Sequence, residues 1–339
     1  MSEGGALPLE RRFPALGALP RAALGTFPSP VQPLALPDAA GPLWVKRDDL
    51  DAPRLGGNKV RALEFLLGAV RPGDLVLTLG GAGSTHVLAT AVHAATLGAR
   101  TRAVRWPHEM NATARAVAAE ITRRCEHAPL DPTPVALARL ALWRLTVRAG
   151  RAERVHYVPL GGSTPLGVLG HVNAALELAD QVAAGELPAP RRIVVPLGSG
   201  GTAAGLALGL AAAGLATEVV GARVAPRLGA TRGRVLRLAA ATRRYARRIA
   251  GVRLPPPAAV RVVHDAYGGA YGRELPAAAR AAALLHDELG IRLDATYSAK
   301  AAAAALALAR ETPDPTLFWL TFDARWLGDG ERSALSDER

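Results

Sequence analysis

The chain has 339 residues, of which half are hydrophobic and only 4% aromatic, and its formal net charge is +12. This length allows two packed domains or one large α/β unit, with a core built mainly from Ala, Leu and Val. The single cysteine, Cys125, excludes an intramolecular disulfide and a cysteine-based metal cluster.

Membrane and nucleic-acid functions are not favoured. No apolar stretch reaches the roughly 18 to 20 residues of a membrane span, and the longest, residues 203–216, is interrupted by glycines. Residues 1–42 are broken by prolines and have no secretory h-region. The arginines of residues 139–154 and 223–253 lack the interleaved aromatics of a nucleic-acid site. We therefore expect a cytoplasmic protein that binds neither membrane nor nucleic acid.

Strands and helices are predicted to alternate after a Pro-rich entry segment that covers the first forty residues. Apolar runs of strand length occur at residues 43–47, 74–79, 101–105, 155–160 and 192–197. Helical periodicity follows at residues 58–70, 85–97 and 111–120, in a segment that ends near residue 184, and at residues 202–213. This alternation predicts parallel sheets that are covered by helices on both faces.

A glycine-rich loop follows the strand of residues 192–197 and reads Gly198-Ser199-Gly200-Gly201-Thr202. Backbone N–H groups of such a loop, with the start of the next helix, can bind an anion such as phosphate. The loop lacks the Lys-Ser/Thr ending of a P-loop, which disfavours nucleoside triphosphate hydrolysis. A tight strand–helix turn without a ligand remains the alternative.

Lysine is rare in this chain. Lys46, Lys59 and Lys300 are the only lysines, and the other 38 of the 41 Lys plus Arg positions are arginine. Lysines kept against such a bias are candidates for chemistry that arginine cannot perform, such as Schiff-base formation. Lys59 follows Gly56-Gly57-Asn58 at a predicted helix start. An amine there, together with a phosphate-binding loop, predicts pyridoxal 5′-phosphate as cofactor.

Several segments carry a resemblance to a known family, and in chain order they are Leu43–Leu50, Gly56–Lys59, Val158–Ser163, Gly198–Thr202, Tyr271-Gly272 and Asp294–Lys300. Together they resemble the signature of the 1-aminocyclopropane-1-carboxylate (ACC) deaminase and D-cysteine desulfhydrase family. The similarity runs from Phe13 to Thr321.

The resemblance implies an α/β fold of the tryptophan-synthase-β type, which is fold type II among pyridoxal phosphate enzymes. It would have two three-layer α/β domains with mostly parallel sheets. Residues 1–58 and 173–339 would form the large domain, and residues 59–172 a small inserted domain. The cofactor would lie in the cleft between them, at the C-terminal ends of the strands. The resemblance also implies a homodimer.

Position by position, the resemblance implies catalytic roles for Lys59, Ser84 and Tyr271. Lys59 would be the Schiff-base lysine and α-proton acceptor, and Ser84 would belong to the substrate loop. Tyr271 would face the substrate, with simple packing as the alternative. Tyr297 would stack on the pyridine ring, and Ser298 would approach its nitrogen. The residues expected to bind the cofactor are Asn58, Lys59, Thr85, Gly198, Ser199, Gly200, Gly201, Thr202, Tyr297, Ser298 and Thr321.

Two positions indicate the reaction. Ser298 stands where the ACC deaminases have glutamate, and it is closer to the threonine of the desulfhydrases. Thr321 also matches the desulfhydrases, since the deaminases have leucine there. Both positions favour β-elimination from a small D-amino acid, and D-cysteine would give pyruvate, hydrogen sulfide and ammonia. The alternatives are an ACC deaminase, which gives 2-oxobutyrate and ammonia, and a cofactor-binding protein without turnover.

The substrate loop and the phosphate surroundings depart from the family pattern. The loop reads Gly83-Ser84-Thr85-His86 and lacks a carboxamide, which Asn58 is a candidate to replace. Ala62 stands where a lysine commonly helps to neutralise the phosphate, and Arg61 is a candidate to compensate.

The C-terminal motif departs as well, because Phe322 and Asp323 replace two glycines and are expected to change the pocket floor. We expect His86 to be a packing or capping residue rather than a general base. The histidines show no metal-ligand spacing, so no metal site is expected.

Overall fold

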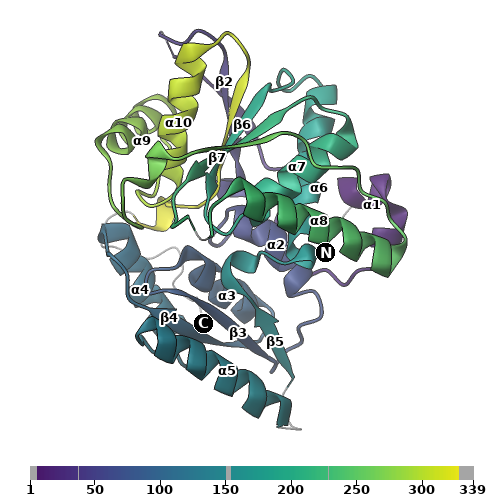
Figure 1. The fold of residues 1–339 in the computed structure, drawn as a ribbon, viewed down its shortest axis with the longest axis vertical. Helices are drawn as coiled ribbons and strands as arrows, with labels where there is room; N and C mark the ends of the chain where they lie inside the picture. Colours follow the sequence, from purple (N-terminus) through teal and green to yellow (C-terminus); the bar gives the residue numbers. More distant parts are fainter. Residues whose placement is uncertain (1–5, 37, 150–153, 228, 328–339) are drawn as a thin grey trace.

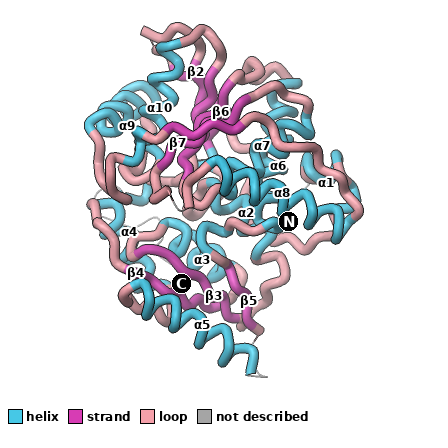
Figure 2. Tube along the Cα trace, in the orientation of Figure 1, coloured by secondary structure: helices cyan, strands magenta, loops and turns pink. Residues whose placement is uncertain are grey.

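The computed structural model describes residues 6–36, 38–149, 154–227 and 229–327 (Figure 1). Its strands form one sheet of six strands and a second sheet of three. Figure 2 shows them as two groups of magenta strands, the larger above the smaller, with cyan helices around both. The expected α/β class with mostly parallel sheets is therefore confirmed.

The strands are β1 (Val31–Leu34), β2 (Leu43–Arg47), β3 (Leu75–Gly81), β4 (Arg100–Trp106), β5 (Val155–Val158), β6 (Arg192–Leu197), β7 (Glu218–Arg223), β8 (Val260–Val263) and β9 (Thr316–Leu320). The α-helices are α1 (Pro8–Arg12), α2 (Asn58–Leu66), α3 (Thr85–Thr96), α4 (Ala112–Arg124), α5 (Thr133–Ala149), α6 (Pro165–Ala183), α7 (Gly201–Ala213), α8 (Arg232–Ala250), α9 (Pro276–Leu289) and α10 (Ser298–Glu311).

The six-stranded sheet has the order β1-β2-β9-β6-β7-β8, and its pairs are parallel apart from β1–β2. Its central strands are apolar on both faces, as parallel strands between two helix layers must be. In β6, Ile193 and Val195 belong to the core formed with α6, α7 and α8. Val194 lies on the opposite face, in the core formed with α9 and α10.

The three-stranded sheet has the order β4-β3-β5 and is parallel throughout. Val76 and Ala103 belong to the core that includes α3, while Leu79 and Val104 pack with residues of α5. Alternate side chains therefore bury both faces of this sheet too, which gives it the predicted three layers.

Helix α2 packs against both α3 and α6, and a buried ion-pair network holds it. The Arg61 guanidinium donates to the Asp48 carboxylate at 2.7 and 2.8 Å and to Glu177 at 2.9 and 3.0 Å. Lys46 donates to the same Glu177 at 2.6 Å. The expectation that Arg61 compensates for Ala62 at the phosphate is wrong, because two buried carboxylates already neutralise its charge.

The predicted strands and helices are present, with ends shifted by a few residues. The entry segment, however, is more than a Pro-rich coil, because it contains α1 and the edge strand β1. Leu9 of α1 is fully buried, and its N–H donates to Asn173 of α6 at 2.9 Å. The sequence analysis also placed no strand after residue 197, where the structure has β7, β8 and β9.

The predicted division into residues 59–172 and the remainder stays a prediction. The strands of the small sheet lie inside 59–172 and those of the large sheet outside it, whereas α6 crosses the division at 172/173. Residues 1–5 and 328–339, at the ends of the proposed large domain, lie outside the described residues.

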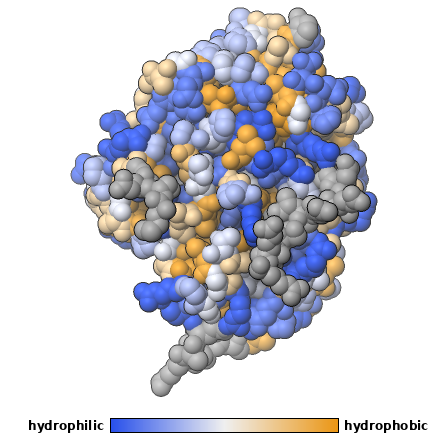
Figure 3. Space-filling model, turned by 180° about the vertical axis from the view of Figure 1, so that it is seen from behind, coloured by the Kyte–Doolittle hydropathy of each residue, from blue (hydrophilic) through white to orange (hydrophobic). Residues whose placement is uncertain are grey.

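No helix among the described residues has the length and apolar character needed to span a membrane. Viewed from behind, the molecule is mostly hydrophilic at its margins, and apolar residues gather toward the middle of that face (Figure 3).

Candidate active site

A cavity of about 490 Å³ lies at the carboxyl ends of strands from both sheets. Loops that follow β3, β4 and β5 meet loops that follow β6, β7 and β9 around it. Ligands of open parallel sheets bind at this edge. The cavity is lined by the predicted site residues Asn58, Lys59, Ser84, Thr85, Gly198, Ser199, Gly200, Gly201, Thr202, Tyr271, Tyr297 and Thr321.

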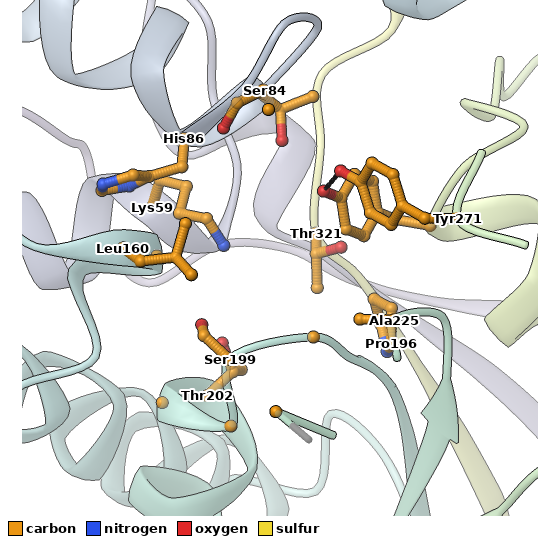
Figure 4. Close-up of a pocket in the computed structure, with 18 of the residues that line it drawn as sticks. Lys59, Ser84, His86, Leu160, Pro196, Ser199, Thr202, Ala225, Tyr271 and Thr321 are labelled. Atoms are coloured by element: carbon orange, nitrogen blue, oxygen red, sulfur yellow. Dashed lines mark hydrogen bonds between the residues drawn. The ribbon is translucent and has the colours of Figure 1, made fainter. Parts of the chain in front are cut away.

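Lys59 lies in the first turn of α2, and its amine points into the cavity (Figure 4). Gly57, two residues before Lys59, has φ 130°, and a Cβ there would collide with the carbonyl oxygen of Thr321. The Lys59 ammonium donates to Asn58 Oδ1 at 3.2 Å. Burial lowers the pKa of Lys59 to about 8, and Asp294 opposes this shift in part. The amine is therefore easier to deprotonate than an ordinary lysine.

The glycine-rich loop forms a cradle at the start of α7. Gly200 is left-handed with φ 90° and precedes the helix, whose first N–H groups lack intrahelical partners. Ser199 Oγ accepts a hydrogen bond from Ser163 at 2.7 Å, and Thr202 Oγ1 accepts one from Asn58 at 2.7 Å. These bonds orient both hydroxyls beside helix N–H groups, as an anion site requires.

Tyr271 lies across the cavity from Lys59 (Figure 4), and Tyr297 lines the same cavity. Their hydroxyls are hydrogen-bonded, and their rings meet edge to face with centroids 5.9 Å apart. Burial raises the pKa of Tyr271 to about 12 and that of Tyr297 well above its ordinary value. Both phenols are therefore protonated at neutral pH.

Asp294 caps the start of α10 and fixes Tyr297. Its carboxylate accepts the N–H groups of Thr296, Tyr297 and Ser298 at 3.1, 2.7 and 2.9 Å. Asp294 lies four residues before α10, ahead of the N-cap Tyr297, and the sequence analysis gave it no role. Ser298 does not line the cavity, and its buried hydroxyl has no hydrogen-bond partner among the described residues.

The substrate loop is held at the start of α3. Ser84 is the N-cap, and its Oγ accepts the Val87 N–H at 3.4 Å. His86 Nε2 lies 3.2 Å from Thr78 Oγ1, and burial lowers the pKa of His86 to about 3. His86 is neutral and buried but also lines the cavity, so the packing role expected for it stays a prediction.

Of the two residues that replace family glycines, one lines the cavity and the other does not. Phe322 lines the cavity, as expected. Asp323 does not line it, because Arg325 holds its carboxylate through two contacts of 2.8 Å. The expectation that Asp323 changes the pocket floor is therefore wrong.

A sequence profile of the family described as "Pyridoxal-phosphate dependent enzyme" matches residues 23–321. The chain belongs to this family. It is 39% identical over 331 residues to nocardicin C-9′ epimerase of Nocardia uniformis subsp. tsuyamanensis, covering 93% of this chain and 96% of that protein. It is 34% identical over 304 residues to D-cysteine desulfhydrase of Salmonella choleraesuis (strain SC-B67), covering 85% and 88%.

Among solved structures, one described as an ACC deaminase homologue superposes with a TM-score of 0.75 at 28% identity, covering 91% of this chain and 94% of that chain. A threonine deaminase superposes with a TM-score of 0.59 at 21% identity, which shows a shared fold. The family resemblance, fold type II and the cofactor inferred from sequence are thereby confirmed.

The residues of this pyridoxal-phosphate-dependent enzyme fit the cofactor. The cradle presents N–H groups and two oriented hydroxyls to a phosphate, and Lys59 presents an amine of lowered pKa. A Cβ at Gly198 would meet only the Tyr297 ring, at 3.9 Å, so the backbone at Gly198 borders open space.

Sequence reasoning missed two cavity residues, Trp106 at the end of β4 and His108 just after it. Nothing local marks them, because they reach the site only through the packing of β4 beside β3. Lys46 and Lys300 do not line the cavity. Among the described residues, no cluster of three or more His, Cys, Asp or Glu could hold a metal ion.

Proposed function

We propose that this pyridoxal-phosphate-dependent enzyme is an epimerase that inverts the α-carbon of an amino-acid moiety. One observation carries the proposal. The Lys59 amine and the Tyr271 hydroxyl enter the same cavity from opposite sides (Figure 4). Inversion needs such an arrangement, because one group must remove a proton and another must return a proton to the opposite face.

The two groups are matched as base and acid near neutral pH. Lys59 has a pKa of about 8 and can accept the α-proton. Tyr271, with a pKa of about 12, holds a proton that it can donate, and its hydrogen bond to Tyr297 orients the hydroxyl. In the reverse direction the roles exchange. The bound cofactor supplies the electron sink that stabilises negative charge at the α-carbon.

Elements around the large sheet would hold the phosphate and the ring of the cofactor. We assign the phosphate to Ser199, Thr202 and the N–H groups that begin α7, the pyridine nitrogen to the Ser298 hydroxyl, and the ring face to Tyr297. Ser84, whose loop borders the cavity, would contact the substrate carboxylate. The common cavity supports the roles of Ser199, Thr202, Tyr297 and Ser84, and the family resemblance supports that of Ser298.

The cavity walls favour a substrate with a neutral, bulky side chain. Trp106, Leu160 and Phe322 line them, and Leu160 is 46% exposed. Among the described lining residues Lys59 is the only lysine, and there is no arginine, aspartate or glutamate. An acidic side chain would therefore lack a partner there. The 39% identity to nocardicin C-9′ epimerase supports the epimerase reaction.

Elimination from D-cysteine is the second candidate. Thr321 lines the cavity at the position that favoured the desulfhydrases, and a desulfhydrase is 34% identical to this chain. Removal of the α-proton by Lys59 would be followed by loss of the thiol, whereas inversion requires Tyr271 as the second group. The ACC deaminase reaction and a binder without turnover remain further alternatives.

The fate of the α-carbon in D₂O tests the proposal. The loaded enzyme is incubated with each enantiomer of cysteine and of aromatic and acidic amino acids, and with 1-aminocyclopropane-1-carboxylate, the cyclopropane substrate. Epimerisation gives the opposite enantiomer with deuterium at the α-carbon and no ammonia, and Tyr271→Phe abolishes inversion. Pyruvate, sulfide and ammonia from D-cysteine would establish elimination instead, and 2-oxobutyrate from the cyclopropane substrate would establish ACC deamination. Lys59→Ala is the control that removes every one of these reactions.

A further inference from the structure

The segment between β4 and α4, residues 107–111, bridges the small sheet to the opposite wall of the cavity. Asn111 Nδ2 donates to the carbonyl oxygen of Gly272 and to Thr296 Oγ1, both at 3.0 Å. Its Oδ1 accepts the Ala114 N–H at 2.8 Å and caps α4. One side chain thus joins the start of α4 to the residues that follow Tyr271 and precede Tyr297.

Gly272 permits this approach. Its φ is 83°, and a Cβ there would lie 2.7 Å from the carbonyl oxygen of Glu109. An alanine at position 272 would therefore force the bridging segment away from Tyr271.

His108 lies in this bridging segment, residues 107–111. Both nitrogens of its imidazole are hydrogen-bonded, and the ring contacts Tyr271. Nδ1–H donates to the carbonyl oxygen of Glu109 at 2.7 Å, and Nε2 accepts the Gly83 N–H at 3.1 Å. These partners require the neutral tautomer with the proton on Nδ1. The ring meets Tyr271 edge to face, with centroids 4.9 Å apart and planes at 83°. His108 also lines the cavity.

We propose that His108 is a positioning residue that holds Tyr271 and the substrate loop in one geometry. Its ring packs edge to face against Tyr271, and its Nε2 accepts the N–H of Gly83, next to Ser84. The role assigned to Tyr271 rests on the proposed epimerase function. Displacement of a reacting group by about 1 Å can cost on the order of a hundredfold in rate.

Two substitutions separate the two contacts. His108→Gln keeps an acceptor within reach of the Gly83 N–H but removes the ring beside Tyr271. His108→Phe keeps a ring there but removes the acceptor. His286→Gln, an exposed histidine on α9, is the matched control.

Exchange of the α-proton in D₂O is measured separately from each substrate enantiomer. Tyr271→Phe should abolish exchange of one enantiomer. That enantiomer is the one whose α-proton Tyr271 removes or returns. We expect His108→Gln to slow exchange of that enantiomer by about tenfold or more and to leave the other within about twofold. His108→Phe is expected to raise KM. It should leave the ratio of the exchange rates of the two enantiomers as in the wild type. Equal losses for both enantiomers, or no loss in His108→Gln, would overturn the proposal.

A second readout does not need turnover. Spectroscopic titration of the phenols in the unloaded protein, with Tyr271→Phe to assign the signal, follows the pKa of Tyr271. Removing the His108 ring admits water and should lower this pKa from about 12, whereas His108→Phe and His286→Gln should not. If the wild type exchanges neither enantiomer, the epimerase proposal fails, yet this titration still decides whether His108 positions Tyr271. An unchanged titration in His108→Gln refutes the positioning role.

Discussion

All three lysines of this arginine-rich chain have specific surroundings. The Lys46 ammonium is fully buried and donates to Ser29 O, Glu177 Oε1 and Gln181 Oε1. Lys300 is 1% exposed and donates to Tyr267 O at 3.4 Å. A compact ammonium with three donors suits such pockets better than a planar guanidinium. Lysine scarcity therefore marked specialised lysines, and the cavity distinguishes Lys59 from the other two.

The lowered pKa of Lys59 predicts a pH-dependent cost to folding in the cofactor-free protein. The charged amine is disfavoured in the folded state, so the cost is fully present below pH 8 and disappears as the pH rises toward 10.5. Lys59→Met removes it, and the variant should unfold with a free energy up to about 3 kcal/mol higher than wild type at pH 7.

Urea unfolding of both proteins between pH 6 and pH 11 measures this difference. The gap should narrow above pH 8 and close near pH 10.5. A gap that is constant over this range would show that Lys59 is not the titrating group.

At the scale of elements, α2 presents Lys59 to the cavity, and Arg61 determines where α2 lies. Arg61 is 2% exposed and connects α2 to Asp48, which follows β2, and to Glu177 of α6. The guanidinium holds the pKa of both carboxyls below their ordinary values, although burial opposes this.

Replacing Arg61 should therefore be costly. Arg61→Met leaves the buried Asp48 carboxylate without its ion-pair partner and leaves Glu177 with Lys46 alone. We expect the free energy of unfolding to fall by about 3–5 kcal/mol. Arg244→Met on the exposed face of α8 is the matched control, expected within about 0.5 kcal/mol of wild type. Chemical denaturation of the cofactor-free proteins measures both. A loss below 1 kcal/mol for Arg61→Met would contradict this account of α2.

Local patterns predicted some elements better than others. The strand at residues 192–197 was predicted with its observed bounds. A short, continuous apolar run that ends at a glycine loop is typical of a buried strand. The entry segment was missed because α1 has five residues, too few to show a period, and it is stabilised by contact with α6.

At the scale of the whole molecule, the candidate site belongs to neither sheet alone. Lys59 and Ser84 come from elements around the small sheet, and the cradle and Tyr297 from elements of the large one. The homodimer and the cytoplasmic location implied by the sequence stay predictions.

Cofactor binding should therefore stabilise both sheets together. At a pyridoxal phosphate concentration a hundredfold above its Kd, the free energy of unfolding should rise by about 2.7 kcal/mol, in one transition. Lys59→Ala should show a smaller rise, because it retains the cradle but lacks the amine. Thermal and urea unfolding with and without the cofactor measure this. Two transitions, of which the cofactor moves only one, would contradict the shared site.

Lys59, the glycine-rich loop and the cofactor could be inferred from sequence because each depends on neighbours within a few residues. A lysine after Gly-Gly-Asn and a glycine run between strand and helix keep their chemistry wherever the elements lie. Tertiary structure decided the rest. The pairing of Arg61 and the meeting of His108 with Tyr271 depend on how distant segments of the chain pack. Contacts between distant segments leave no local periodicity, so composition and spacing could not place them.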